Sequence, residues 1–217
     1  MAVVFKKGDV SIKKMKEGSY KIDYEEGDYK HYWKFVKELI GEKNGNFEAK
    51  GVVSLKELLN EKKKSLSYHH LSFFFKQVGN QYVNLEKDGY GKVFIKMEDI
   101  LVIHKNENKS GSIFLCLGLE DIFKIEKTDI KINFPYKKSR VSTFFSPELK
   151  NGKVFPLKIK KTSCIFSLAL LISFCINDKI NLESITECLS PIAETKLYYC
   201  LLRCLEEETY NRYYLWI

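Results

Sequence analysis

The chain has 217 residues, of which 45% are hydrophobic and 29% are charged. This length corresponds to one domain, or two at most, and the composition excludes the collagen-like, coiled-coil and wholly disordered classes. The formal net charge is +8, but only Arg140, Arg203 and Arg212 are arginines. Base readout and bidentate phosphate binding favour arginine over lysine, so we expect no nucleic-acid partner.

Cysteine usage indicates a reducing compartment. Five of the six cysteines lie in the last 54 residues, and no C-x-x-C pair occurs. Cys200 and Cys204 are one helical turn apart, but no histidine pair follows at zinc spacing. We therefore predict buried, reduced thiols, no metal and no cofactor, in a cytoplasmic protein without a signal peptide.

The longest apolar run, 165–176, has 12 residues. A membrane-spanning helix needs about 20, so we expect no membrane span. Because apolar residues occupy every face of this segment, it is predicted to form a helix that is buried on all sides.

In chain order, the sequence predicts a little β structure followed mostly by helices. Residues 1–27 indicate one or two short strands, and 41–51 a loop. Apolar residues at helical spacing predict a helix over 29–40. A short helix is expected over 53–59, because Ser54 and Glu57 have the spacing of a capping box.

The second part of the chain is predicted to contain one hairpin and several helices. A long amphipathic helix is expected over 67–85, and residues 120–146 are expected to form a long connection. Two β-like runs, 99–104 and 112–117, flank a segment of turn composition. The remaining expected helices span 162–177, 181–189 and 191–206, with a short last one after them.

Five segments, in order, resemble motifs of the protein kinase C-lobe. LEKDGYGKVFIKMEDIL (85–101) is similar to the catalytic-loop stretch, and IFLCLGLEDI (113–122) to the stretch that contains D-F-G. FFSPEL (144–149) resembles the region of the A-P-E motif, and TSCIFSLALLISF (162–174) the buried central helix. CLEEETYNRYYL (204–215) is similar to the C-terminal motif with its arginine. The resemblance implies a buried ion pair between Glu148 and Arg212.

The residues that phosphotransfer needs differ from the kinase pattern. The H-R-D triplet is replaced by Lys92, Val93 and Phe94, and D-F-G by Cys116, Leu117 and Gly118. Phenylalanine can neither accept a proton nor bind a metal, and a thiol is a poor ligand for Mg²⁺. Lys96 matches the catalytic-loop lysine, and Asp99 stands at the asparagine that binds the second metal. The brace aspartate of the central helix is replaced by Cys164.

The segment before the C-lobe-like region is short and lacks a glycine-rich phosphate loop. The run VSIK (10–13) resembles V-A-I-K, in which the lysine, here Lys13, pairs with a helix glutamate. Candidate partners are Glu25, Glu26 and Glu38. We therefore expect an α+β, mainly α, kinase-like fold. It would comprise a reduced N-lobe-like segment over 1–52 and a helical C-lobe-like domain over 53–217.

The resemblance implies a pseudokinase that acts as a protein-binding scaffold, decoy or allosteric regulator, with a kinase or its substrate as a possible partner. One alternative is the kinase non-catalytic C-lobe domain, a cytoskeletal or signalling adaptor whose V-S-L-x-E-x-L opening is similar to residues 53–59. An atypical active kinase is the other alternative. Ser142 and Thr143 are candidate phospho-acceptors, and His69 and His70 are interpreted as packing residues. The lysine-rich composition suggests a parasite or a large DNA virus.

Overall fold

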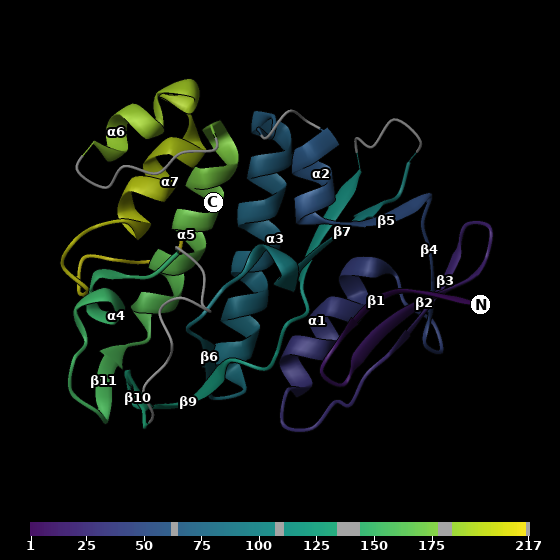
Figure 1. Cartoon of the computed structure of the whole chain (residues 1–217), viewed down its shortest axis with the longest axis horizontal. Coiled ribbons are helices and arrows are strands. Elements are labelled where there is room, and N and C mark those ends of the chain that lie inside the picture. Colours follow the sequence, from purple (N-terminus) through teal and green to yellow (C-terminus); the bar gives the residue numbers. More distant parts are fainter. Residues whose placement is uncertain (62–64, 107–110, 134–143, 178–183, 216–217) are drawn as a thin grey trace.

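A computed structural model describes residues 1–61, 65–106, 111–133, 144–177 and 184–215 (Figure 1). Helix accounts for 41% and strand for 27% of the structure, in a mixed α/β fold with three small antiparallel sheets. The expected combination of helices and strands is confirmed. The strand content is nevertheless larger than the sequence indicated, because several strands are only three to five residues long.

The first sheet lies at the end of the molecule that holds the N-terminus and has the order β1–β2–β3–β4 (Figure 1). One face of its strands and helix α1 contribute to the same buried cluster, in which Ile12 and Trp33 are fully buried. The predicted helix is confirmed, whereas three strands form where one or two were expected, and β4 lies in the expected loop. The elements are β1 (Ala2–Lys7), β2 (Val10–Lys16), β3 (Ser19–Asp23), α1 (Lys30–Ile40) and β4 (Asn46–Glu48).

The predicted hairpin forms two of the three strands of the second sheet, which has the order β5–β7–β8. The capping box is confirmed: the Ser54 N–H donates to the Glu57 carboxylate at 2.6 Å, and the Glu57 N–H donates to Ser54 Oγ at 3.2 Å. The long helix α3 is confirmed as well, and it begins after Ser67. These elements are β5 (Gly51–Ser54), α2 (Leu55–Glu61), α3 (Tyr68–Lys87), β7 (Ile100–His104) and β8 (Ser112–Cys116).

Two glutamines of α3 form hydrogen bonds with the backbone groups at the outer edge of β8. The Phe114 N–H donates to Gln77 Oε1 at 2.7 Å, and the Cys116 N–H donates to Gln81 Oε1 at 2.8 Å. Gln81 Nε2 donates in turn to the Phe114 carbonyl at 2.9 Å. Because buried backbone groups need partners, these amides allow a sheet edge to pack against a helix.

The third sheet, of order β11–β10–β9–β6, contradicts the expected long connection over 120–146. Strands β9 and β10 form a tight hairpin there, with Lys127 in the left-handed region at φ 60°. Their alternation of apolar and charged residues was too short to stand out in a polar segment. The elements are β6 (Tyr90–Lys92), the 3₁₀ turn η1 (Met97–Asp99), β9 (Ile122–Glu126), β10 (Asp129–Ile132) and β11 (Leu157–Lys160).

Helix α5 runs through the largest core cluster, and Asn177 is its only exposed residue. The prediction of a helix buried on all sides is therefore confirmed. The expected helix over 181–189 is shorter, and its first part lies outside the described residues. The helices of this part are α4 (Pro147–Asn151), α5 (Thr162–Asn177), α6 (Ile185–Cys188), η2 (Ser190–Ile192) and α7 (Lys196–Cys204).

The expected last helix does not form among the described residues, 205–215. This segment returns across α3 instead, and the Tyr214 hydroxyl donates to the Lys76 carbonyl at 3.0 Å. Gly79 permits this approach, since a Cβ at that position would overlap the Tyr214 ring. The packing of the segment against α3 is thus specific, although its local sequence forms neither helix nor strand.

Candidate functional site

A buried ion pair between Lys92 and Asp99 forms the centre of the candidate site. Lys92 Nζ lies 2.9 Å from Asp99 Oδ2, and their side chains are 2% and 1% exposed. Lys92 is the last residue of β6 and also donates to the Gly118 carbonyl. Asp99 ends the turn η1, where its Oδ2 accepts the Lys96 backbone N–H at 3.2 Å. The carboxylate therefore caps its own turn while it neutralises a buried lysine.

A second ammonium group reaches the same carboxylate from the first sheet. Lys7 is the last residue of β1, and its Nζ contacts Asp99 Oδ1. The two-residue turn after Lys7 contains Gly8 in the left-handed region at φ 52°, which glycine adopts without strain. Both oxygens of one buried carboxylate are thus engaged by lysines from elements that are far apart in the sequence.

Burial affects both lysines. Desolvation lowers the pKa of the Lys92 amine from its ordinary value, and the positive charges of Lys7 and Lys96 act in the same direction. Burial also lowers the pKa of Lys7, and Lys96 adds to this effect. Glu120 and Glu98 oppose the shift at Lys7, and Asp121 opposes it at Lys92, so the site is a mixed cluster of lysines and carboxylates.

Gly118 fits this site because it has no side chain. A Cβ at this position would approach three atoms of Asp99 to 3.0 Å or less. The Leu117 N–H donates to the Asp99 carbonyl at 2.8 Å, which holds the segment after β8 against η1. The structure therefore brings Leu117 and Gly118 together with Lys92 and Asp99.

Cys116 lies beside the cluster, and its contacts serve the packing of the fold. Its carbonyl accepts the Tyr32 hydroxyl of α1, and the thiol is 1% exposed as part of the residue. Burial raises the pKa of this thiol, although Lys92 and Lys7 oppose the effect. The thiol is accordingly protonated at neutral pH.

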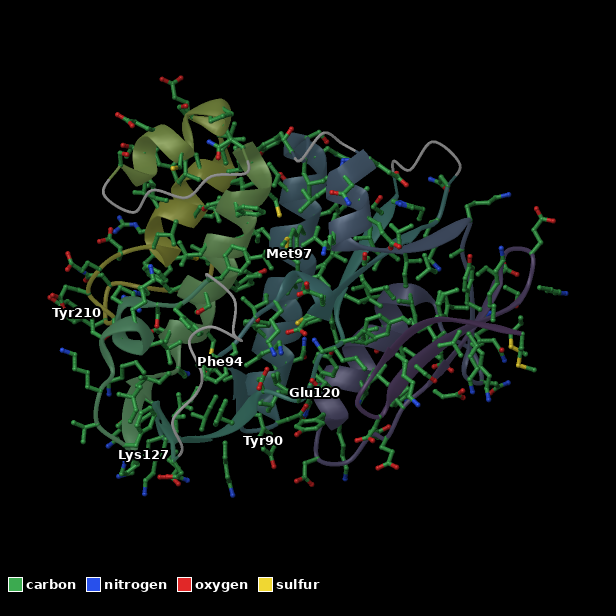
Figure 2. The ribbon with its side chains drawn as sticks, in the orientation of Figure 1. Tyr90, Phe94, Met97, Glu120, Lys127 and Tyr210 are labelled. Carbon is green, nitrogen blue, oxygen red and sulfur yellow. The ribbon has the colours of Figure 1, made fainter. Side chains whose placement is uncertain are left out.

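Val93 and Phe94 point into a separate apolar core. Phe94 is 2% exposed and packs edge-to-face against Phe123 and Phe145, with ring centroids 5.8 and 5.6 Å apart. Figure 2 shows Phe94 beside β6 in the part of the molecule that contains the third sheet. The backbone between Lys92 and Asp99 thus passes over a hydrophobic cluster.

Two further charged residues surround the cluster. Lys96 forms an ion pair with Asp121 at 2.9 Å, with about a quarter to a third of each side chain exposed. Glu120, labelled in Figure 2, lies next to Gly8, since a Cβ on Gly8 would be 3.5 Å from its Cγ. Charged side chains therefore lie where the first sheet comes close to the segment after β8.

Lys13 lies away from this cluster, on the outer face of the first sheet. Its Nζ is 2.8 Å from Asp23, which also pairs with Lys21 at 2.8 Å. The expected partners Glu25, Glu26 and Glu38 are wrong. The register of β2 and β3 sets Ser11 opposite Asp23, so Lys13 and Asp23 are diagonal neighbours on one face.

Glu148 and Arg212 come together as the resemblance implied. Arg212 Nη1 donates to Glu148 Oε1 at 2.6 Å, and the guanidinium lies 4.5 Å from the Phe166 ring. Its other nitrogens donate to the Glu206 and Glu207 carbonyls at 2.5 and 2.6 Å. Arg212 is fully buried while Glu148 is 22% exposed, so the pair is less buried on the acidic side than expected.

The sequence patterns did not identify Lys7 or Asp121 as residues of the site. The Gly8–Asp9 pair between two alternating runs is a hairpin-turn signal, and it places Lys7 at the end of a strand. No local signal indicates that the residue at the end of this strand contacts Asp99, which lies 92 positions further along the chain. The two glutamines of α3 did have a signal, since they stand four residues apart on the apolar side of a helix.

A small cleft lies beside β6, between α3 and α5. Its lining includes Tyr82, Cys164 and Leu168, and the ion pair of Glu86 with Lys161 lies at the same cleft. Burial raises the pKa of the Cys164 thiol to about 12. The cleft therefore presents mainly apolar surface and no thiolate nucleophile.

Several other expectations concern cysteines, metals and membranes. The six cysteines are free thiols. Within the described ranges, no cluster of three or more histidine, cysteine or acidic residues has the arrangement of a metal site. Over the same ranges, none of the helices has the length and apolar character needed to span a bilayer. Ser142 and Thr143 lie outside the described residues.

Comparison of the chain with protein-family models and with curated proteins gives no match.

Proposed function

We propose that this protein is a pseudokinase-like binding protein that transfers no phosphate. The order of its elements supports the proposal: a sheet with a helix between β3 and β4 is followed by α2, α3, two hairpins and the buried helix α5. This order resembles that of a protein kinase. The positions at which a kinase has its catalytic and metal-binding aspartates are Phe94 and Cys116, and both side chains are buried here.

The observation that carries the proposal is the double occupation of Asp99. A kinase carboxylate at a metal site must offer its oxygens to Mg²⁺ and, through it, to the nucleotide phosphates. Lys92 and Lys7 contact both Asp99 oxygens. Their ammonium groups occupy the positions beside the carboxylate that a metal cation would take. Because Lys7 is the last residue of β1, its contact also holds the β1–β2 turn near Asp99. Metal binding at Asp99 would require displacing both.

The N-terminal region favours this proposal over the kinase non-catalytic C-lobe domain. That domain lacks the nucleotide-binding lobe, whereas here β1–β4 and α1 share a core cluster with the β7–β8 hairpin. The capping box at Ser54 and Glu57 is compatible with either class. The N-terminal sheet is therefore an integral part of the fold, as expected of a reduced kinase-like protein.

Nucleotide titration and phosphotransfer test the proposal. We expect that ATP, with Mg²⁺ or Mn²⁺, leaves the thermal unfolding midpoint unchanged and that no label from γ-labelled ATP appears on the chain or on generic substrates. The proposal is wrong if label is transferred and the transfer is abolished by Asp99→Ala. Asp99→Ala removes a buried ion-pair partner and therefore destabilises the fold. Asp121→Asn, at a partly exposed position, is a second substitution whose effect on phosphotransfer is measured in a folded protein.

A further inference from the structure

Strand β1 forms an open edge of the first sheet. It pairs with β2 on one side, and no other strand among the described residues pairs with it. Val3 is 58% and Val4 is 40% exposed. Ala2 and Val3, which are paired neighbours in the strand, are both exposed; because such neighbours point to opposite faces, solvent reaches both faces of β1 there. Figure 1 shows β1 and the N-terminus at the end of the molecule opposite α6 and α7.

This edge has few of the features that prevent pairing with another chain. An edge strand offers unpaired N–H and C=O groups, and proteins usually block it with charges, proline or a covering segment. Residues 2–5 contain neither a charge nor a proline. Two protective features are present in β1: the register irregularity between Val3 and Phe5, and the charges of Lys6 and Lys7 at the C-terminal end of the strand.

The surroundings of the edge are basic. Residues 1–21 contain six lysines and two acidic residues. Lys6 is exposed at the end of β1, and Lys14 is exposed in β2, directly opposite Ala2. Asp23 compensates only Lys13 and Lys21. A strand that lies along β1 therefore has exposed ammonium groups near both of its ends.

We propose that β1 binds an extended, acidic segment of a partner protein, which adds a fifth strand to the first sheet. Main-chain hydrogen bonds to the edge supply affinity, and Lys6 and Lys14 select acidic side chains. A second copy of this chain is disfavoured, because its own edge would set the same lysines against each other. The inference rests on the proposed role as a binding protein and names the chemistry of the partner.

A labelled peptide of ten alternating valines and glutamates, with blocked ends, tests this inference by fluorescence anisotropy. We expect saturable binding that weakens with salt. We also expect a peptide of the same sequence, N-methylated at its two central residues, to bind at least tenfold more weakly, because methylation removes donors from both of its edges. The amide resonances of residues 2–7 should shift on titration with the unmethylated peptide.

Matched charge reversals distinguish the edge from general attraction to a basic protein. Lys6→Glu with Lys14→Glu should weaken binding at least tenfold. Lys124→Glu with Lys153→Glu changes the net charge equally, at exposed positions outside the first sheet, and should leave the affinity within twofold. All four side chains are exposed, so the variants are expected to fold.

Equal affinity for the methylated peptide, equal effects of the two double variants, or no binding would each overturn the inference. So would a dimer in sedimentation that Val4→Glu dissociates, because a second copy would then occupy the edge. The proposed function fails separately, by phosphotransfer that Asp99→Ala abolishes, and that outcome does not change the peptide result.

Discussion

The Arg212 guanidinium and the Glu148 carboxylate are in contact at 2.6 Å, although 64 positions separate them in the chain. All three nitrogens of Arg212 donate a hydrogen bond, one to Glu148 and two to backbone carbonyls, and the guanidinium stacks on Phe166 of α5. One buried side chain thus joins α4, α5 and the segment after α7.

Replacing Arg212 should therefore be costly. We expect Arg212→Ala to lower the free energy of unfolding by roughly 3–5 kcal/mol, because it breaks a largely buried pair and strands its partner. Denaturant unfolding measures the change. Arg203→Ala is the matched control, since Arg203 is 58% exposed and lies 4.0 Å from Glu206; we expect it to cost less than about 1 kcal/mol. Similar costs for the two variants would contradict a central role for Arg212.

Leu168 tests the burial of α5. This residue is 1% exposed in the largest core cluster, so Leu168→Ala should cost about 2–5 kcal/mol through lost transfer energy and a cavity. Val154→Ala, at a position that is 77% exposed, should change stability by less than about 0.5 kcal/mol. Chemical denaturation of both variants checks the prediction, and a small effect at Leu168 would mean that α5 has a solvent-exposed face.

Gly118 tests the close packing of the candidate site. Gly118→Ala places a methyl group against Asp99, and we expect it to destabilise the protein by about 1–3 kcal/mol, as overpacking does. Gly51→Ala is the control, because a Cβ there meets its nearest neighbour at an ordinary 3.8 Å. The thermal midpoints of the two variants give the comparison. Equal midpoints would show that Asp99 is not held against Gly118.

Thiol chemistry tests the burial of the cysteines. Burial raises the pKa of Cys164 and of Cys204 to about 12, and it also raises that of Cys116. Because only the thiolate reacts, these thiols should resist iodoacetamide at pH 8 in the native state and react after unfolding. Mass spectrometry counts the modified sites. Cys200, which is partly exposed, is the internal control, and native alkylation of Cys164 ahead of Cys200 would refute the arrangement.

Asp129 gives the protein an acid-dependent element of stability. Hydrogen bonds from Lys160 and then Lys158 lower the pKa of this carboxyl to about 2. Because the pKa of the folded state lies below that of the unfolded chain, the stabilisation is fully present above the ordinary value of 3.8. It is lost as the pH falls through 2. Asp129→Asn should thus be less stable than the wild type at pH 6, with the difference shrinking below pH 4.

Urea unfolding at several pH values measures this difference. Lys158→Met with Lys160→Met removes the cause of the shift, so Asp129→Asn in that background should have little effect at any pH. A constant gap between wild type and Asp129→Asn from pH 6 to pH 2 would be incompatible with the ion-pair explanation.

The helices could be predicted from the sequence because their signals are local. The spacing of apolar residues located α1, α3 and α5, and the capping box of Ser54 and Glu57 located α2. The strands β9 and β10 were missed because four or five residues give too few alternations. Their partners also lie as far away as β6 and β11, which no local pattern encodes.

The candidate site was predictable only in part, for a related reason. Motif positions drew attention to Lys92, Asp99 and Gly118, but they marked these residues as degenerate and did not indicate that they contact one another. Lys7 is brought to Asp99 by the β1–β2 turn and by the packing of the first sheet. Such a contact depends on the whole fold, so sequence spacing alone could not reveal it.

Lys7 also connects two places that have been described separately. It is the last residue of the open strand β1, and its ammonium group contacts Asp99 in the interior. Coupling between two equilibria is reciprocal. If a strand bound along β1 strengthens or weakens the Lys7–Asp99 contact by some factor, the contact changes the affinity of β1 for that strand by the same factor. Lys7→Met would therefore alter the affinity of the edge by the same factor by which occupation of the edge favours or opposes that contact. The six residues of β1 thus connect an exposed strand edge with the buried carboxylate of Asp99.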